Sequence, residues 1–522
     1  MTPVGMRAVA SGSSVGGRGG TGTGPWRPLK ALLGGGIEVP AQFEISDLTM
    51  DSRHVMPGAA FLACRGQRVH GVQHAAEAVA AGARAVLWEP ANGVAAPQLP
   101  PEVLVVAVPG LSTQAGFIAD RFFDAPSAHL AVTGITGTNG KTTCAWLQGA
   151  ALNVAGRRCA YLGTLGVGLP GQVVAGTHTT PDAVTLQRQL AQLRAAGASA
   201  VAMEVSSHAL DQQRCGGVRF QIAAFTNLSR EHLDYHGDMQ RYADAKSALF
   251  DWPTLAATVI NVDDELGFTL ATRTRDAATL ICTGRRRDPG SVVPGSRYVR
   301  AVRSAPEPRG LCLELASSWG PAMLRSELIG EFNVDNLLTV LGLLLASGLA
   351  LSDACAALGE CHAPPGRMQL AGGSGLPLAI VDYAHTPDAL KKALRAARAH
   401  CAGRLLCVFG CGGERDAGKR AEMGRVAETL ADALYITDDN PRREDPAAII
   451  AAILSGLRAP QDAIVQHDRG ASIAAALGAA QAGDVVLIAG KGHEDYQIIG
   501  TERRAYSDLV QVRAALGARS AA

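Results

Sequence analysis

The sequence predicts an α/β protein with three domains. A chain of 522 residues is too long for one ordinary core, because domains usually hold about 100–200 residues. Apolar runs of strand length alternate with helical stretches, which is typical of parallel sheets covered on both faces. Pro-containing breaks at 124–127 and 363–366 divide this pattern. We therefore expect domains at 25–127, 128–364 and 365–522, after an extension at 1–24.

The extension at 1–24 is rich in Gly, Ser and Thr from residue 11 onward. It lacks the continuous apolar stretch of a signal peptide, so we expect it to be disordered and assign it no function. The region that follows, 25–127, is predicted to be a small α/β domain. Its expected strands lie at 61–64, 85–88 and 103–108, among Ala-rich helical stretches.

The two larger regions carry stronger strand signals. In the second, continuous apolar runs are expected to form strands of a mostly parallel sheet, at 130–133, 200–205, 222–226 and 258–262. In the third, strands are expected at 378–381, 405–409, 434–436 and 485–488, with helices at 387–400 and 468–482. This alternation predicts a Rossmann-like, doubly wound C-terminal domain.

Composition excludes several classes of function. The net charge is +1, whereas nucleic-acid-binding proteins usually carry a basic excess, so no nucleic-acid partner is expected. The longest apolar run, 337–351, is shorter than the about 20 residues that a bilayer requires, so no membrane insertion is expected. Eleven cysteines without a CxxC pair indicate reduced, mostly buried thiols in a cytoplasmic protein.

The most specific local motif is TGTNGKTT at 136–143. It follows an expected strand and precedes a helix expected from about Cys144, which is the context of a phosphate-binding loop. Glycines let backbone N–H groups surround phosphate oxygens, Lys141 reaches the terminal phosphates, and the Thr142 hydroxyl can hold Mg²⁺. Ile135 stands where the strict pattern has its first glycine. The alternative is a Gly-rich turn, and the loop alone indicates only a nucleoside triphosphate.

Further motifs follow in order along the chain. They are DSR at 51–53, TTPD at 179–182, MEVSSHAL at 203–210, HLDYH at 232–236, YADAK at 242–246, FNVDN at 332–336, DYAH at 382–385, DNPR at 439–442 and GKGHE at 490–494. Together with the phosphate loop, this set resembles the Mur ligases and their folylpolyglutamate synthetase relatives. The resemblance covers about 45–508 and is far more specific than any single motif.

The resemblance implies a three-domain, ATP-dependent ligase of peptidoglycan precursor synthesis, and hence of cell-wall biogenesis, cell shape and cell division. The first domain would bind a UDP-sugar, the central domain ATP and the third an amino acid. The implied substrates are UDP-MurNAc-L-Ala-D-Glu, meso-diaminopimelate and ATP. ATP would phosphorylate the D-Glu carboxylate, and the amine would attack the acyl phosphate. Two Mg²⁺ ions and a monomeric enzyme are expected.

The resemblance assigns catalytic roles to Lys141, Glu204, His232 and Lys246. The metal ligands would be Thr142, Glu204, His232 and Lys246, the last if it is carbamylated. Glu204 ends an apolar strand at the sheet edge where α/β proteins bind ligands, which suits a Mg²⁺ ligand. The alternatives are a solvated loop carboxylate for Glu204, a capping or surface histidine for His232, and an exposed helix lysine for Lys246.

The substrate contacts are likewise carried by resemblance. For ATP they are Gly137, Thr138, Asn139, Gly140, Lys141, Thr142, Thr143, Asn333, Arg367 and Asp382. For the UDP-sugar and its peptide they are Ser52, Thr179, Thr180, Ser206, Gln212 and Arg214, with Arg214 suited to an anionic group. His178 stands where some relatives have Asn, so its contact is left open.

Diaminopimelate would be bound by Arg415, Asp439, Asn440, Pro441, Arg442, Gly490 and Glu494. A guanidinium at Arg442 matches the second carboxylate that distinguishes diaminopimelate from lysine. The alternative for 439–442 is a Pro turn with a surface arginine.

Three rival functions remain: a folylpolyglutamate-type ligase, a lysine-adding Mur ligase and a nucleotide-sensing P-loop module. The motifs at 51–53 and 439–442 oppose the first rival, and Arg442 opposes the second. The polar motifs of the third domain oppose the last, because a sensor would not require them.

Overall fold

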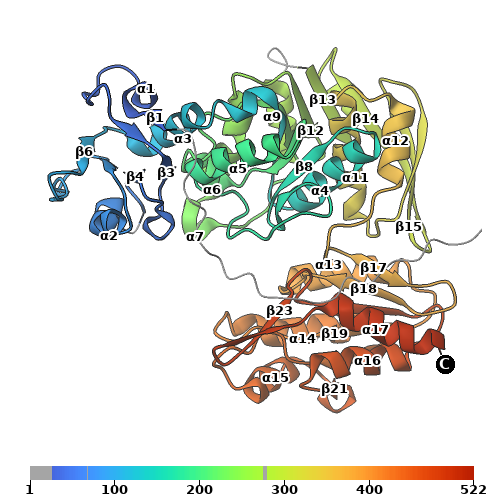
Figure 1. Cartoon of the computed structure of the whole chain (residues 1–522). Helices are drawn as coiled ribbons and strands as arrows, with labels where there is room; N and C mark the ends of the chain where they lie inside the picture. Colours follow the sequence, from blue (N-terminus) through green and yellow to red (C-terminus); the bar gives the residue numbers. More distant parts are fainter. Residues whose placement is uncertain (1–25, 68, 274–278, 522) are drawn as a thin grey trace, which may run out of the picture. The chain divides into compact units, whose positions relative to one another are not determined.

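The computed structural model describes residues 26–67, 69–273 and 279–521 (Figure 1). The chain forms two compact units, Met1–Phe122 and Phe123–Ala522. The second unit contains two large sheets of its own, one of ten strands and one of six. The extension expected at 1–24 lies outside the described residues, as does residue 25.

The first unit is built on a four-stranded parallel sheet in the order β3-β4-β5-β6. The strands are β3 (Asp47–Thr49), β4 (Ala59–Ala63), β5 (Ala85–Trp88) and β6 (Leu104–Ala107). Beside the sheet lie α1 (Leu29–Leu33), α2 (Ala75–Ala80), α3 (Leu111–Phe122) and the short pair β1 (Arg27–Pro28) and β2 (Glu44–Ile45). The expected strands correspond to β4, β5 and β6. The sequence does not predict β3, because three residues are too few for an apolar run.

The ten-stranded sheet has the order β16-β15-β14-β13-β12-β11-β7-β10-β8-β9. Its parallel part consists of β7 (Ala131–Thr136), β8 (Cys159–Gly163), β10 (Ala200–Glu204), β11 (Phe220–Phe225), β12 (Ala257–Asn261), β13 (Thr279–Gly284) and the start of β14 (Arg297–Glu307). These strands are mostly buried on both faces, as the continuous apolar runs predict.

Helices cover both faces of this sheet (Figure 1). One apolar core joins it to α4 (Lys141–Val154), α11 (Phe332–Ala346) and α12 (Leu351–Gly359). The other core joins it to α5 (Ala183–Ala195), α6 (Ser207–Asp211), the 3₁₀ turn η4 (Ala248–Asp251) and α9 (Glu265–Arg273). The apolar run at 337–351 is therefore the buried helix α11 and the start of α12. None of the described helices is long and apolar enough to cross a bilayer.

An antiparallel edge extends the central sheet beyond the prediction. β14, β15 (Gly310–Ser317) and β16 (Ala322–Ser326) pair antiparallel, as do β8 and β9 (Gly166–Gly168). Buried and exposed residues alternate along β16 and the first half of β14. Such strands carry no continuous apolar run, which is why the sequence does not predict them.

The six-stranded sheet has the order β17-β18-β22-β19-β20-β21. Its parallel strands are β18 (Leu378–Asp382), β22 (Val485–Ala489), β19 (Leu405–Phe409), β20 (Ala433–Ile436) and β21 (Ile464–Val465), and β17 (Gln369–Gly372) is antiparallel. One face packs on α13 (Pro387–Arg398), α14 (Gly418–Leu430) and α15 (Pro446–Leu454), the other on α16 (Arg469–Ala479) and α17 (Asp508–Ala521). The doubly wound prediction is confirmed.

The prediction of unpaired, mostly buried cysteines is also confirmed. All eleven cysteines are free, with Cys312 and Cys401 partly exposed and the others buried. Burial raises the pKa of Cys144, Cys159 and Cys407 well above that of a free thiol, to about 12 for Cys159 and Cys407. Buried, protonated thiols are chemically inert.

Candidate active site

The phosphate loop joins the end of β7 to the start of α4. Gly137 has φ 146° and Gly140 has φ 86°, both in the region that favours glycine. A Cβ on Gly137 would lie 1.9 Å from Thr226 Oγ1, and one on Gly140 would lie 2.3 Å from Asn336 Oδ1. Both glycines are therefore required by backbone angle and by space. The helix begins at Lys141 rather than at Cys144, so Lys141, Thr142 and Thr143 form its first turn.

Two lysine amines meet at this loop. Lys141 Nζ donates to the carbonyls of Gly137 at 2.6 Å and Thr138 at 2.8 Å. Lys246 Nζ, from α8 (Met239–Ser247), donates to the same Gly137 carbonyl at 2.8 Å. Lys246 is 1% exposed, and its amine lies 4.4 Å from the centre of the Tyr242 ring. The alternative of an exposed helix lysine is thus wrong.

Burial and the neighbouring charge perturb both amines. Burial, together with the positive charge of Lys141, lowers the pKa of Lys246 to about 6. Burial also lowers the pKa of Lys141. A large part of Lys246 is therefore a neutral amine at pH 7.

Glu204, the last residue of β10, is fully buried beside the same loop. Its carboxylate accepts hydrogen bonds from Thr142 Oγ1 at 2.9 Å, from the Thr164 N–H at 2.9 Å and from Thr164 Oγ1 at 3.2 Å, as well as from the Tyr161 hydroxyl. A Cβ on Gly163 would lie 2.2 Å from Glu204 Oε1. These contacts exclude the alternative of a solvated loop carboxylate.

The Glu204 carboxylate is stabilised by neutral donors. It forms no ion pair within the part of the chain that the structure describes. A buried carboxylate held next to the Thr142 hydroxyl offers two hard oxygen ligands, which is the donor set that Mg²⁺ prefers. The chemistry of these two residues therefore fits a magnesium ion.

His232 lies in a ring cluster that reaches the loop. It has φ 56° and precedes α7 (Leu233–His236). Its ring centre lies 6.0 Å from that of Tyr242 and 5.0 Å from that of His208. The Tyr242 hydroxyl lies 3.1 Å from Thr138 Oγ1. Over residues 26–67, 69–273 and 279–521, no three His, Cys, Asp or Glu side chains form a metal-binding group, so protein atoms alone do not complete a site here.

The residues expected to contact the sugar-linked peptide form one connected group. Thr180 Oγ1 donates to the Glu204 carbonyl at 2.9 Å and accepts from the Ser206 N–H at 3.1 Å. Thr179 Oγ1 lies 3.0 Å from Thr164 Oγ1. Arg214 donates to the Thr180 carbonyl and, through Nε, to Gln212 Oε1, both at 2.9 Å. Arg214 is thus already oriented by protein oxygens.

Ser52 belongs to the first unit, in the 3₁₀ turn η1 (Ser52–His54). Its hydroxyl donates to Glu77 Oε2 at 2.8 Å. Asp51 caps this turn by accepting from the Arg53 N–H at 3.0 Å, and its bond to the Arg53 guanidinium holds the pKa of Asp51 well below the usual range. The DSR motif therefore also has a local structural role, because Asp51 and Arg53 stabilise this turn.

Three residues expected near ATP make contacts with neighbouring groups of the protein itself. Asn333, buried in α11, donates to the Ile329 carbonyl at 2.8 Å and accepts from Asn336 Nδ2 at 2.8 Å. Asp382 accepts from the N–H groups of Met368 at 2.8 Å and Ala384 at 2.9 Å. The Arg367 guanidinium lies 4.9 Å from the centre of the Tyr383 ring.

The residues expected to bind the amino acid lie after the carboxyl ends of β19, β20 and β22. Asn440 Nδ2 donates to Glu494 Oε2 at 2.9 Å, and Asn440 Oδ1 accepts from Lys491 Nζ at 3.0 Å. Lys491 is fully buried and also donates to Glu494 Oε2 at 3.0 Å. A Cβ on Gly490 would lie 2.5 Å from Asp439 Oδ2.

Arg442 is fixed by its backbone. It has φ 54°, donates its N–H to the Ile498 carbonyl at 3.0 Å, and accepts from the Gly500 N–H at 2.7 Å. Its Nη1 donates to the Gly413 carbonyl at 2.7 Å. Arg415 is exposed and forms no ion pair with any residue that the structure describes. A β-bridge pairs Arg442 with Ile499, and the role of 439–442 in amino-acid binding stays a prediction.

Three family models match this chain: the Mur ligase family catalytic domain at 44–116, the Mur ligase middle domain at 135–344 and the Mur ligase glutamate ligase domain at 366–492. A Pseudomonas aeruginosa protein named UDP-N-acetylmuramoyl-L-alanyl-D-glutamate--2,6-diaminopimelate ligase is 48% identical over 475 residues, which cover 91% of this chain and 95% of that protein. The chain belongs to the Mur ligase family. This Mur ligase is thereby an ATP-dependent ligase, and the resemblance is confirmed.

Other relatives agree with this family. A protein of the same name from Xylella fastidiosa is 48% identical over 484 residues. These residues cover 91% of this chain and 95% of the Xylella protein. A solved structure of an enzyme of that name is 34% identical, with a TM-score of 0.71 over 95% of this chain and 100% of the other. Mycobacterium tuberculosis folylpolyglutamate synthase complexed with ADP and AMPPCP shares the fold, at 17% identity and TM-score 0.56 over 72% of this chain and 92% of that chain. The predicted three-domain α/β fold is confirmed.

Sequence reasoning missed several residues of this ligase. Tyr161 and Thr164 donate to Glu204, and Gly163 makes room for it. Tyr242 connects Lys246, His232 and the loop, and Lys491 neutralises Glu494. Tyr242 and Lys491 lie inside quoted motifs, so their position was a usable signal. Tyr161 and Thr164 carry no motif, and only the pairing of β8 with β10 brings them to the site.

Proposed function

We propose that this Mur ligase joins meso-diaminopimelate to the D-Glu carboxylate of UDP-MurNAc-L-Ala-D-Glu, with release of ADP and phosphate. The observation that carries the proposal is the junction of Lys141, Lys246 and Glu204 around one phosphate loop. The names of relatives at 48% identity supply the substrates. On this proposal the protein acts in the cytoplasm, as a monomer, in peptidoglycan precursor synthesis.

The phosphoryl-transfer step follows from the charges at the loop. Transfer from ATP to a carboxylate brings two anions together, so positive charge and positioning matter more than covalent chemistry. The loop N–H groups and the start of α4 would hold the triphosphate, and Lys141 would leave its two carbonyl partners for the terminal phosphates. Thr142 and Glu204 would hold Mg²⁺, which supplies charge neutralisation when bound.

Carbamylation of Lys246 is part of the proposal. A neutral amine adds CO₂ at its nitrogen and releases a proton, which converts the neutral side chain into an anionic carbamate. The lowered pKa of Lys246 and its burial against Tyr242 support this change, because the neutral form is the reactive one. The carbamate, together with His232, would help to hold a second Mg²⁺.

The bond-forming step would follow at the acyl phosphate. An uncharged amine of diaminopimelate attacks the acyl carbon, the tetrahedral intermediate releases phosphate, and the amine loses its proton. Thr179, Thr180, Ser206, Gln212 and Arg214 would orient the sugar-linked peptide, and Ser52 would contact the UDP-sugar. Arg214 would meet an anionic substrate group with the N–H groups that protein oxygens leave free.

Amino-acid selection would lie in the third domain. Arg442 and Arg415 would bind the carboxylates of diaminopimelate, and Glu494 with the Gly490 carbonyl would receive the distal ammonium. Lysine would leave Arg442 without an anion, and a site built for a polar group rejects the analogue lacking it by up to about 10⁴-fold. We assign the UDP-sugar domain to 25–127, the ATP domain to 128–364 and the amino-acid domain to 365–522.

Phosphate release tests the proposal. Purified protein is supplied with ATP, Mg²⁺ and UDP-MurNAc-L-Ala-D-Glu, with and without meso-diaminopimelate. A ligase needs the amine for sustained turnover, whereas a nucleotide-sensing module would hydrolyse ATP at the same rate without it. Steady phosphate release that is independent of the amino acid would contradict the proposal.

A further inference from the structure

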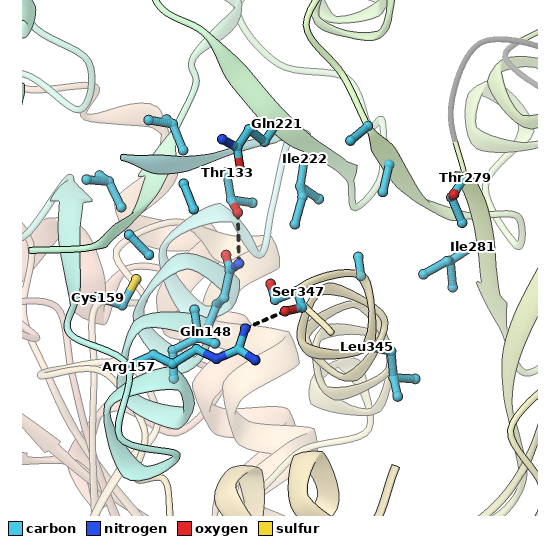
Figure 2. Close-up of a pocket in the computed structure, with 18 of the residues that line it drawn as sticks. Thr133, Gln148, Arg157, Cys159, Gln221, Ile222, Thr279, Ile281, Leu345 and Ser347 are labelled. Atoms are coloured by element: carbon cyan, nitrogen blue, oxygen red, sulfur yellow. Dashed lines mark hydrogen bonds between the residues drawn. The ribbon is translucent and has the colours of Figure 1, made fainter. Parts of the chain in front are cut away.

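A hollow of about 580 Å³ lies in the central sheet region, away from the phosphate loop. Its walls include the first residues of β7, β10, β12 and β13, whereas the phosphate loop and Glu204 follow the other ends of β7 and β10. Figure 2 shows it between these strands, the middle of α4 and the end of α11. Its volume lies within the about 300–1,000 Å³ of small-molecule sites.

A buried amide faces this hollow without a full set of partners. Gln148, on α4, is 1% exposed and donates through Nε2 to Thr133 Oγ1 at 2.9 Å (Figure 2). Its Oε1 is buried and has no hydrogen-bond partner among the described residues. A buried carbonyl oxygen without a hydrogen-bond partner is destabilising, so the position favours an occupant with an N–H or O–H donor.

Two guanidinium groups line the same hollow. Arg157 donates to the Ser347 carbonyl, and Arg297 lies 5.0 Å from the centre of the Trp319 ring. Neither arginine forms an ion pair within the described part of the chain, and the described lining includes no Asp or Glu. Both arginines are exposed and lie at the rim of the hollow, where their charge can attract an anionic occupant.

The remaining wall is largely apolar. Leu152, Ile222, Ile281 and Leu345 contribute aliphatic surface, and Trp319 adds an aromatic face. Apolar walls with a few polar groups are the usual composition of a small-molecule site.

We propose that this hollow is a second ligand site, which takes a small carboxylate with an apolar, ring-bearing body and one N–H or O–H donor. The donor meets Gln148 Oε1, the carboxylate meets Arg157 or Arg297 at the rim, and the body packs on the aliphatic wall. The occupant contacts α4 and α11, the helices whose first turns carry Lys141 and Asn333. The site is independent of the proposed ligation reaction.

The test uses indole-3-propionate, which has all three features. The full-length protein is labelled with 5-fluorotryptophan and saturated with ADP and Mg²⁺, so that the nucleotide site is filled. The fluorine resonance of Trp319 is assigned with Trp319→Phe and followed during titration. We expect a saturable shift of the Trp319 resonance, weakened about tenfold by Arg157→Gln or by Arg297→Gln.

Matched controls separate the proposed contacts from general affinity. Arg158→Gln changes an exposed neighbour outside the hollow and should leave the dissociation constant unchanged. A naphthalene analogue without the N–H and skatole without the carboxylate should each bind about tenfold more weakly. The absence of a saturable shift with indole-3-propionate would overturn the proposal. It would also be overturned if both analogues bound as tightly as indole-3-propionate and both arginine variants bound indole-3-propionate as tightly as the parent protein.

Discussion

The edges of the two large sheets use charge in opposite ways. At the central sheet, two lysine amines share the Gly137 carbonyl, and the buried Glu204 is held by neutral donors. At the C-terminal sheet, the buried charges are paired: Arg469 with Asp508 at 2.7 Å, Lys491 with Glu494 at 3.0 Å and Arg420 with Glu444 at 2.6 Å. We infer that the first edge keeps its charges for ligands that carry opposite charge. At the second edge the pairs fix the shape of the loops, and of these residues only Glu494 also belongs to the proposed amino-acid site.

This difference has an energetic reason. A buried charge without a partner costs several kcal/mol, and that cost persists only where a ligand compensates it. Paired charges need no ligand, and they hold loops in one conformation. Removal of a central charge should therefore affect chemistry, and removal of a C-terminal charge should affect selectivity or stability.

The largest expected effect is that of Lys141→Ala. Turnover should fall about 10³-fold or more, because the terminal phosphates lose their nearest cation. Phosphate release with all three substrates measures it. Lys391→Ala, an exposed lysine on α13, serves as the control and should retain full activity. Comparable activity in the two variants would contradict the assigned role of Lys141 and of the phosphate loop.

Lys246→Ala should be nearly as damaging. If the carbamate matters, high bicarbonate with a short-chain acid should partly restore turnover. Because the pKa of Lys246 is lowered to about 6, the neutral amine, and with it the carbamate, should increase as pH rises through 6 at fixed CO₂. With ¹³C-labelled bicarbonate, a carbamate resonance should appear in the parent protein and be missing from the variant. A spectrum without such a resonance in either protein would contradict carbamylation.

The sequence predicts these two regions unequally. The phosphate loop and the apolar strands are predictable because glycine spacing and continuous apolar runs are local signals. Tyr161 and Thr164 are not, since only sheet pairing places them on Glu204. The antiparallel edge of β14, β15 and β16 is missed because a half-exposed strand has no apolar run. The ion pair of Arg469 with Asp508 joins residues 39 positions apart, which no local pattern reveals.

Arg442→Lys should produce a smaller, selective effect. An ammonium cannot make the two parallel hydrogen bonds of a guanidinium, so kcat/KM for meso-diaminopimelate should fall about 100-fold. Activity with L-lysine, which the proposal expects to be low in the parent protein, should change little. Parallel assays with both amino acids measure the ratio. An equal loss for both substrates would assign Arg442 to the fold of the loop rather than to selection.

The smallest effect is expected for Glu444→Gln, which breaks a pair on the C-terminal edge. The hydrogen bond to Arg420 lowers the pKa of Glu444 to about 2, so its stabilisation is present above the usual pKa of 4.5 and is lost as pH falls towards 2. The Tm should drop by at most about 3 °C at pH 7, and the difference should shrink in acid. Glu422→Gln, an exposed residue of α14, is the control. A difference that grows in acid would reverse the assigned sign.

The central claim is that one sheet edge activates the acid and the other selects the amine. Its most direct test is the mass of the UDP-linked product after parallel reactions with meso-diaminopimelate, L-lysine and glutamate. The account predicts efficient formation of the diaminopimelate product alone, with each of the others at least about 100-fold slower. Equal incorporation of lysine, or preferred incorporation of glutamate, would contradict it.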